Sequence, residues 1–429
     1  MFKKSLSYDE AIVIVGAGVF GLTTALELRQ RGYKNITVLD RMMPPVPDGS
    51  SVDISRIVRY DYSDPFYAEL AREAVDAWRS GPFRPFYHNT GFVLTSEAAV
   101  DPFLEKLKAV LRSQGQKFTD FRSSEELKHM FPDLRHVQEN FTGYLNPNAG
   151  WADAAGAIAA LAARCSEQGV SIIAGPRGTV LSLKTAGSRV LGVNVASGPP
   201  LLCSKVILAT GAWTNRFLDL THAISSSAQP IGFIQLTPEE AASISQMPVL
   251  INMTSGFFIF PPTPDTHILK VACHSHGFET RVTVDGTDRV ISSPKRDSNN
   301  AASSFLPEEA DAALRHGLRQ VVPQFAEKPW MKRRLCWYTD TPEGNFVVDY
   351  HPSIERLFIA TGGAGHGFKF LPILGRYIAD CFEEKAPAHI RQKWRLENGQ
   401  NAKGPMVCND GSRRGPERRL LTVEEQAKL

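Results

Sequence analysis

The sequence predicts an α/β (α+β) fold, and three observations support this prediction. Short apolar runs at residues 11–15 (AIVIV) and 36–40 (ITVLD) flank a helical pattern that ends at Gly32. Later helical patterns, each opened by an aspartate and closed by a glycine, cover residues 64–81, 101–115 and 153–169. Strand-like runs separated by turns dominate residues 170–213 and 228–295. We therefore expect a Rossmann-like domain with an inserted mixed-sheet domain.

The first helix is preceded by the glycine-rich turn GAGVFG, residues 16–21. Gly16 permits a tight turn, Gly18 lets the backbone approach a pyrophosphate, and Gly21 lets the helix pack closely on the strand. Asp40 ends the second strand, where a carboxylate can accept ribose hydroxyl groups. This strand–turn–helix–strand context predicts dinucleotide binding, with FAD or NAD favoured over NADP. The alternative is a glycine-rich turn without a ligand in an unrelated α/β protein.

Segments typical of a nucleotide-binding domain alternate with strand-rich segments along the chain. We assign the discontinuous nucleotide-binding domain to residues 1–82, 145–222 and 326–395. We assign the inserted substrate-binding domain to residues 83–144 and 223–325. Residues 396–429 are polar and non-periodic, so we expect a loose C-terminal tail there.

Composition and charge exclude several classes of protein. The net charge of the 429 residues is only +3, which gives no reason to expect a nucleic-acid partner. No apolar run reaches the roughly 18–20 residues that span a bilayer, so no membrane partner is expected either. The six cysteines form no CxxC pair and no metal-ligand spacing. We therefore expect no metal site and a reducing intracellular compartment. We also expect a monomer.

The chain ends in Ala427-Lys428-Leu429, a small-basic-leucine tripeptide. Such a tripeptide resembles the peroxisomal import address, for which S-K-L is the type form. It predicts a peroxisomal protein that an import receptor recognises, with the cytoplasm as the alternative. A peroxisomal location is meaningful for an enzyme that makes hydrogen peroxide.

Cys336 is a lone thiol in the stretch RLCWYTDTPEGNF, residues 334–346. From composition alone, a cysteine of this kind is most often a small buried hydrophobic residue. The arginines at 333 and 334 also suit a reactive thiolate, which is the nucleophilic form of the side chain.

Six motifs occur in order along residues 10–390. They are GAGVFG with Asp40, GSSVDISRIVRYDY (49–62), ILATGAW (207–213), LKVACH (269–274), CWYTDTPEGNFVVDYHP (336–352) and GGAGHGFKF (362–370). Together they resemble the FAD-dependent amine oxidases typified by monomeric sarcosine oxidase. This family includes saccharopine and pipecolate oxidases and the fructosyl amino acid oxidases. The resemblance implies a Rossmann-like FAD-binding domain and a mixed-sheet substrate-binding domain.

The resemblance also implies which residues hold the cofactor. Cys336 corresponds to the cysteine that joins the flavin covalently through a thioether. The other implied FAD contacts are Gly16, Gly18, Phe20, Gly21, Asp40, Ser55, Arg56, Val180, Gly211, Trp213, Gly365, His366, Gly367 and Lys369.

The substrate and oxygen sites follow from the same resemblance. Arg59 and Lys369 are expected to grip a substrate carboxylate through charge-assisted hydrogen bonds, although Arg56 and Arg59 could also lie on a solvated helix face. Lys270 is the expected oxygen-activating catalytic residue, together with Arg56 beside the flavin. Lys270 could instead be a strand lysine that points to solvent. The further implied substrate contacts are His274, Tyr338 and Phe258, of which the histidine could instead be a satisfied core residue.

The implied activity is oxidation of a C–N bond in a secondary amino acid to an imine, with O₂ reduced to hydrogen peroxide. Val52 and Phe258 replace a histidine and a tyrosine of sarcosine oxidases, so L-saccharopine or L-pipecolate is favoured over sarcosine. The SRIVR stretch at 55–59 also departs from the fructosyl amino acid oxidases. The alternatives from other classes are a flavin dehydrogenase with a carrier acceptor and a non-catalytic nucleotide-binding protein.

Overall fold

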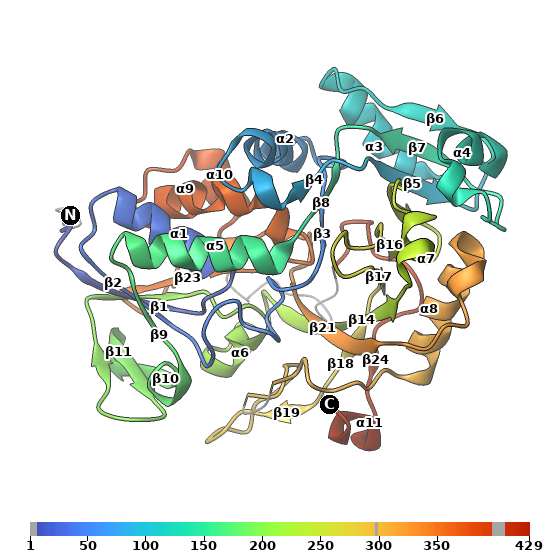
Figure 1. Cartoon of the computed structure of the whole chain (residues 1–429). Helices are drawn as coiled ribbons and strands as arrows, with labels where there is room; N and C mark the ends of the chain where they lie inside the picture. The colour runs from blue at the N-terminus through green and yellow to red at the C-terminus, as the bar shows by residue number, and fades with distance from the viewer. Residues whose placement is uncertain (1–6, 297–298, 397–407) are drawn as a thin grey trace.

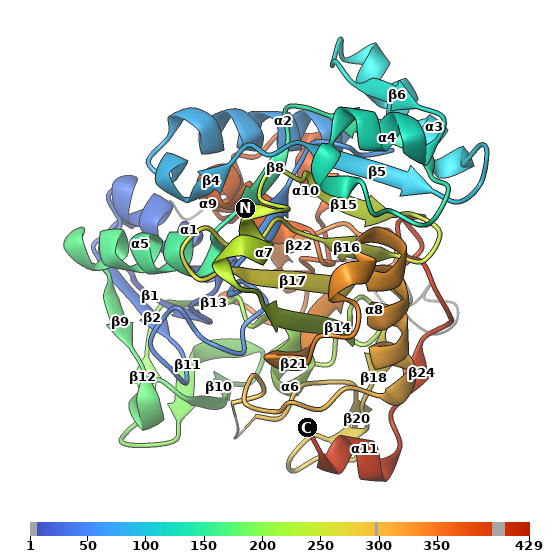
Figure 2. The same cartoon turned by 45° about the vertical axis from the view of Figure 1, so that its right-hand side comes forward.

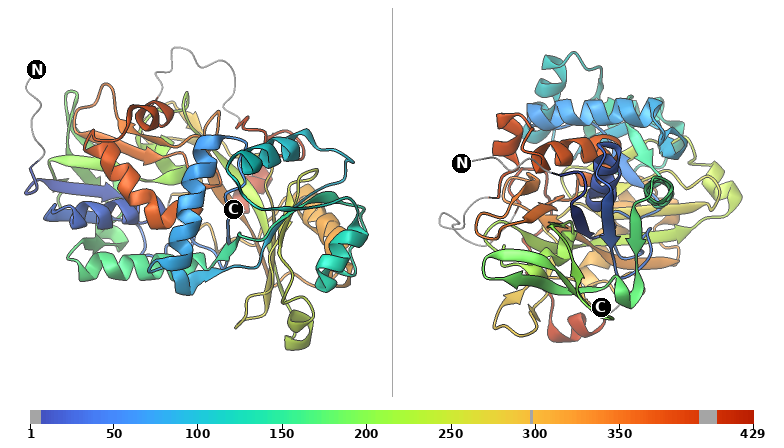
Figure 3. Two further views of the ribbon diagram at one scale, coloured as in Figure 1. Left: turned by 90° about the horizontal axis from the view of Figure 1, so that it is seen from above. Right: turned by 90° about the vertical axis from the view of Figure 1, so that its left-hand side faces the viewer.

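The computed structural model describes residues 7–296, 299–396 and 408–429. Two large sheets, each covered by helices, lie side by side in the described chain (Figures 1 and 3). The C-terminus lies beneath the second sheet (Figure 1).

The first sheet has six strands, and all but its edge strand β22 run parallel. Their order is β22 (Val347–Tyr350), β23 (Leu357–Thr361), β13 (Lys205–Leu208), β1 (Ala11–Val15), β2 (Asn35–Leu39) and β9 (Ser171–Ile173). The central strands are buried on both faces and consist almost entirely of Val, Ile, Leu and Ala, as parallel strands between two layers require.

Helices cover one face of this sheet and a small sheet covers the other (Figure 1). The helical layer contains α1 (Val19–Gln30), α5 (Ala154–Glu167) and α9 (Leu371–Phe382), flanked by α2 (Pro65–Ser80) and α10 (Ala388–Lys393). The opposite layer contains β10 (Val180–Ala186), β11 (Arg189–Val195) and β12 (Leu201–Leu202), followed by the short helix α6 (Thr214–Phe217).

The second sheet has ten strands and forms the other half of the molecule (Figure 2). Its path is β24 (Arg419–Leu420), β18 (Phe278–Glu279), β14 (Ser225–Gln235), β17 (Ile268–Cys273), β16 (Phe257–Ile259), β15 (Val249–Asn252), β5 (Phe92–Ser96), β7 (Thr142–Asn146) and β6 (Thr119–Phe121), while β21 (Lys332–Asp340) pairs with β14. Helix α8 (Glu308–Val321) packs on one face, and α3 (Pro102–Ser113), α4 (Ser124–Met130) and α7 (Pro238–Ala242) surround the sheet.

Smaller elements complete the described chain. A three-stranded sheet of β3 (Arg56–Val58), β8 (Gly150–Ala152) and β4 (Tyr87–His88) lies between the two halves, and β19 (Val282–Thr283) pairs with β20 (Val290–Ile291). No helix among the described residues has both the length and the apolar composition needed to cross a membrane.

The predicted helix starts are confirmed by their capping bonds. The Asp64 carboxylate accepts a hydrogen bond from the Phe66 N–H, and Asp101 and Asp153 cap α3 and α5 in the same way. Each cap satisfies a backbone N–H that the helix itself cannot bond. The mixed α/β architecture predicted from these local signals is therefore present.

The expectation of a loose tail is wrong for residues 408–429. Strand β24 pairs in parallel with β18, and α11 (Val423–Ala427) starts with a capping box between Thr422 and Glu425. Arg413 is 5% exposed and Leu421 is 1% exposed, so these two side chains fix the segment to the rest of the molecule. Residues 397–407 of the predicted tail lie outside the described residues.

Candidate active site

A deep cavity extends from the β1–α1 turn of the first sheet to the inner face of the second sheet. It brings together most of the predicted site residues: Gly16, Gly18, Phe20, Asp40, Arg56, Arg59, Val180, Gly211, Trp213, Phe258, Lys270, His274, Tyr338, Gly365, His366, Gly367 and Lys369. Gly21, Ser55 and Cys336 do not line it. Residues more than 350 positions apart in the sequence thus line the same cavity.

The β1–α1 turn needs its glycines for steric reasons. Gly16 has φ +110°, and a Cβ there would lie 2.3 Å from the carbonyl oxygen of Ala209. A Cβ on Gly21 would lie 1.9 Å from the Gly16 carbonyl oxygen. These contacts require glycine for close packing, and Gly16 and Gly18 line the cavity at the N-terminus of α1, where N–H groups and the helix dipole favour a phosphate.

Asp40 closes the same end of the cavity. Its carboxylate accepts hydrogen bonds from the Ala17 and Arg41 N–H groups, each at 2.7 Å. Burial raises the pKa of this carboxyl. The two backbone bonds fix the carboxylate beside the turn, where it can face a ribose.

Asp53 is the centre of a buried cationic cluster, of which Arg56 and Lys270 line the cavity. Its carboxylate lies 2.6 Å from Arg56 Nη1, 2.9 Å from Lys270 Nζ and 3.8 Å from Arg334 Nη2. Lys270 also donates to the Ser55 carbonyl oxygen at 2.5 Å. Burial lowers the pKa of Lys270 to about 7 although Asp53 opposes this shift. Three cations and one anion leave this cluster with an excess of positive charge.

Cys336 lies at the edge of this cluster. The thiol is buried on β21, and Arg56 Nη2 donates to its Sγ at 3.5 Å. Arg56 lines the cavity, and so does Tyr338, two residues further along the strand. Side chains two apart on a strand point to the same side. Cys336 therefore lies on the same side of β21 as Tyr338, next to Arg56.

Arg59 and Lys369 also line the cavity and share one aromatic neighbour. Arg59 Cζ lies 4.9 Å from the Tyr62 ring centroid, and Lys369 Nζ lies 5.2 Å from it. Arg59 Nη1 is buried and has no hydrogen-bond partner among the described residues. An unpaired guanidinium nitrogen at a cavity wall is costly unless a ligand binds it, so this wall suits an anion.

The negative charge of Asp61 raises the pKa of Lys369 against burial and the Arg59 charge, which lower it. Tyr144 donates to Asp61 Oδ1 at 2.9 Å, and the Asn146 amide donates to Oδ2 at 2.8 Å. Burial raises the pKa of Asp61, and nearby Arg59 opposes this shift. Both donors come from β7, so the second sheet holds this anion in place behind the two cations.

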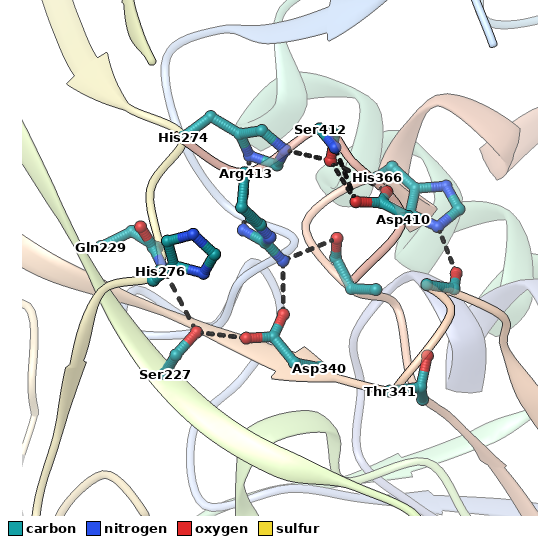
Figure 4. A network of polar contacts seen from close by, with 12 residues as sticks. Ser227, Gln229, His274, His276, Asp340, Thr341, His366, Asp410, Ser412 and Arg413 are labelled. Carbon is teal, nitrogen blue, oxygen red and sulfur yellow. Dashed lines mark hydrogen bonds and ion pairs between the residues drawn. The ribbon is translucent and has the colours of Figure 1, made fainter. Parts of the chain in front are cut away.

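His274 is held by the C-terminal segment rather than left free (Figure 4). Arg413 Nη1 lies 3.4 Å from its Nδ1, and Ser412 Oγ lies 3.0 Å from its Nε2. Because a guanidinium only donates, Nδ1 accepts and the ring proton is on Nε2. Ser412 in turn donates to Asp410 at 2.7 Å. Burial lowers the pKa of His274, so the ring that lines the cavity is neutral and offers mainly its carbon edge.

Arg413 anchors this segment by a buried ion pair with Asp340 (Figure 4). Asp340 also accepts from Ser227 at 2.6 Å and from Arg418 at 2.7 Å. The guanidinium carbon of Arg413 lies 4.7 Å from the Tyr338 ring centroid. The C-terminal residues therefore form one wall of the cavity.

Sequence reasoning missed Asp53, Asp61, Tyr62, Asp410, Ser412 and Arg413. The first three lie within the quoted stretch 49–62, so their position there was the available signal. The last three lie in a segment without periodicity, and no sequence signal indicates that it reaches the cavity.

Comparison with known proteins identifies the family. The model of the FAD-dependent oxidoreductase family matches residues 11–381, so the chain belongs to this family. It is 30% identical to L-saccharopine oxidase of Schizosaccharomyces pombe over 92% of this chain and 94% of that protein. It is 23% identical to mouse peroxisomal sarcosine oxidase over 90% and 95% of the two chains. The crystal structure of fructosamine oxidase (Amadoriase II) from Aspergillus fumigatus superposes with a TM-score of 0.84, 28% identity and 96% coverage of both chains.

The described residues fit FAD. The glycine-rich β1–α1 turn suits a pyrophosphate, and the Asp40 carboxylate beside it suits a ribose. The predicted family and fold class are thus confirmed, and the protein is a flavin-dependent oxidoreductase related to amino acid oxidases.

Proposed function

We propose that this protein is an FAD-dependent oxidase of a secondary amino acid and that L-saccharopine or L-pipecolate is its preferred type of substrate. The observation that carries the proposal is the unpaired, buried Arg59 guanidinium nitrogen beside Lys369 in the same cavity as Lys270. When bound, FAD would accept a hydride equivalent from the carbon next to the amine and pass the electrons to O₂. Water hydrolyses the resulting imine.

The chain supplies orientation and charge. Arg59 and Lys369 bind the substrate carboxylate by charge-assisted hydrogen bonds and set the position of the neighbouring amine. Phe258 and Phe260 provide an apolar wall, with their ring centroids 5.8 Å apart. This wall excludes water from the reacting carbon.

Lys270 and Cys336 serve the flavin side of the site. Lys270 places a buried positive charge where O₂ becomes an anion, which stabilises the charge that develops. Cys336 is the proposed point of a thioether to the flavin, supported by its place behind Arg56 at the edge of the cationic cluster. We include in this proposal the other FAD contacts that the sequence predicts.

The relatives support the choice of substrate. The similarity to L-saccharopine oxidase is higher, at 30% identity, than the 23% identity to the sarcosine oxidase. Phe258 and Val52 line the cavity and make it more apolar than a tyrosine and a histidine would, which disfavours sarcosine. Deglycation of fructosyl amino acids is the second possibility within the same chemistry, supported by the similarity in fold to fructosamine oxidase.

We further propose that the protein acts as a monomer in the peroxisome, where catalase removes hydrogen peroxide. The terminal tripeptide supports this location, as does the name of the peroxisomal relative. Ala427 and Lys428 are exposed and Leu429 is half-buried, so an import receptor could reach the first two without rearrangement.

A peroxide assay on a panel of four amino acids tests the function. The panel contains L-saccharopine, L-pipecolate, sarcosine and fructosyl-valine. We expect hydrogen peroxide with the first or second at a kcat/KM well above the other two. Substrate-dependent flavin reduction without peroxide, and with activity only toward an artificial electron acceptor, would instead identify a dehydrogenase.

A further inference from the structure

The side-chain nitrogen of Lys369 makes two hydrogen bonds that fix its orientation. Nζ donates to the Tyr62 hydroxyl oxygen at 2.8 Å and to the His366 carbonyl oxygen at 2.9 Å. A neutral lysine amine has two N–H groups, and these two bonds use both of them. The remaining tetrahedral position is therefore a lone pair in the neutral form and a third N–H in the charged form.

Hydrogen bonds of His366 and Tyr62 fix the direction of these two bonds. His366 Nε2 lies 2.7 Å from the Gly344 carbonyl oxygen, which can only accept, so this nitrogen carries the ring proton. His366 Nδ1 is then an acceptor, and the Tyr62 hydroxyl donates to it at 3.0 Å. The Tyr62 oxygen is left to accept from Lys369. Burial lowers the pKa of His366 to about 3, in agreement with a neutral ring.

The surroundings of Lys369 favour the neutral amine before a ligand arrives. The residue is 4% exposed, and burial together with the nearby Arg59 charge lowers its pKa. Asp61, on the same segment as Arg59, is the opposing anion. An anionic carboxylate bound between Arg59 and Lys369 adds a second negative charge, which favours protonation of Lys369.

We propose that Lys369 accepts the proton of the substrate ammonium when the substrate carboxylate binds, and that Tyr62 and His366 are positioning residues that direct its lone pair. This inference rests on the carboxylate clamp of the proposed function. A secondary amino acid enters as a zwitterion, but only the neutral amine can be oxidised. The transfer balances: R₂NH₂⁺ and the neutral Lys369 amine become R₂NH and the Lys369 ammonium. This single transfer makes the substrate amine neutral, so that it can be oxidised. It also makes Lys369 positive, so that it can bind the substrate carboxylate together with Arg59.

Isothermal calorimetry of the FAD-loaded enzyme tests this transfer. The probe is methoxyacetate, a carboxylate of the size of sarcosine that has an ether oxygen in place of the amine. Titration in two buffers with different ionisation enthalpies measures the protons taken up per ligand. We expect an uptake that approaches one proton at pH values above the Lys369 pKa, and an affinity that falls about tenfold per pH unit there. Binding without uptake at every pH between about 6 and 10, where a lysine with a lowered pKa titrates, overturns the inference alone.

Three variants make the result specific. Lys369→Arg keeps the positive charge but cannot take up a proton, so it is expected to bind methoxyacetate with no proton uptake. Tyr62→Phe removes the acceptor of one Lys369 N–H, so the midpoint of the uptake profile should shift to lower pH. Tyr67→Phe is the matched control, because its ring stacks on Tyr62 at 5.7 Å while its hydroxyl bonds Phe346 and Trp394 instead. It should leave the profile unchanged.

Two outcomes separate the inference from the proposed function. Unchanged proton uptake in Lys369→Arg means that another group takes the proton, which overturns the inference and leaves the clamp intact. Failure of the wild-type enzyme to bind any carboxylate overturns both. As a further check, L-pipecolate added anaerobically to the enzyme with its flavin already reduced should bind with no net proton uptake, because this ligand brings its own proton.

Discussion

The Lys270 ammonium nitrogen lies 2.9 Å from the Asp53 carboxylate, and both side chains are 1% exposed. Asp53 raises the pKa of Lys270 against the burial that lowers it to about 7. An isolated ammonium in such a site would lose its proton more readily, so Asp53 keeps Lys270 charged up to a pH of about 7.

Reoxidation of the reduced flavin by O₂ should therefore depend on pH. Lys270 is charged below its pKa of about 7 and neutral above it, so the second-order rate constant should fall as the pH rises through about 7. Stopped-flow mixing of reduced enzyme with O₂ measures this constant. Lys270→Met should lower it on the order of 10²-fold and remove the pH dependence, while anaerobic flavin reduction by substrate changes little.

Asp53→Asn should move the same pH profile in a defined direction. Without the carboxylate, Arg56 and burial both lower the pKa of Lys270, so the midpoint should shift below its wild-type value. The variant also leaves buried cations uncompensated, which costs about 3–5 kcal/mol of unfolding free energy. A midpoint at higher pH would contradict the assigned role of Asp53.

Arg59→Met should raise KM for the amino acid substrate by about 10–100-fold, since it removes a charge-assisted hydrogen bond worth about 1.5–3 kcal/mol. Steady-state peroxide kinetics measure the effect. Arg72→Met is the control, because this arginine is 44% exposed in a surface pair with Asp76 at 3.8 Å. Equal KM values in both variants would show that Arg59 does not bind substrate.

Cys336→Ser should release the flavin from the polypeptide. After acid precipitation of the wild-type protein, we expect the yellow colour in the pellet and a flavin mass on the peptide that contains Cys336. The serine variant should leave the colour in the supernatant. Cys381→Ser removes another buried thiol, which lies on α9 away from the cavity lining, and should behave as wild type.

Asp340→Asn should destabilise the protein by about 3–5 kcal/mol, because it leaves the buried Arg413 and Arg418 without their anion. Urea unfolding measures the loss. Glu355→Gln, which disrupts the exposed pair with Arg189, should cost less than about 1 kcal/mol. A loss in Asp340→Asn as small as in this control would mean that the C-terminal segment is not anchored through Arg413.

Local signals made much of the fold predictable. The β1–α1–β2 unit and the caps at Asp64, Asp101 and Asp153 depend on residues a few positions apart, so they could be predicted from the sequence. The position of the C-terminal segment could not be predicted, because Arg413 and its partner Asp340 are 73 positions apart and no periodic pattern marks either residue. The role of Asp61 is likewise set by partners 83 and 85 positions away.

The site was predictable in a similar way. The resemblance brought together Lys270, Arg59, Lys369 and most of the other predicted residues, and all six motif regions contribute residues to the cavity. The counter-ions Asp53 and Asp61 were missed because their effects on Lys270 and on Lys369 join residues more than 200 positions apart. The domain boundaries remain predictions, and β21 pairs with the second sheet although it lies in the segment assigned to the FAD-binding domain.

The central claim is most directly tested by a single turnover of the FAD-loaded enzyme. Anaerobic addition of L-saccharopine or L-pipecolate should bleach the flavin absorbance, and admission of air should restore it with one hydrogen peroxide formed per flavin. An absorbance that stays unchanged with both amino acids, or a reduced flavin that persists in air, would contradict the assignment of an amino acid oxidase.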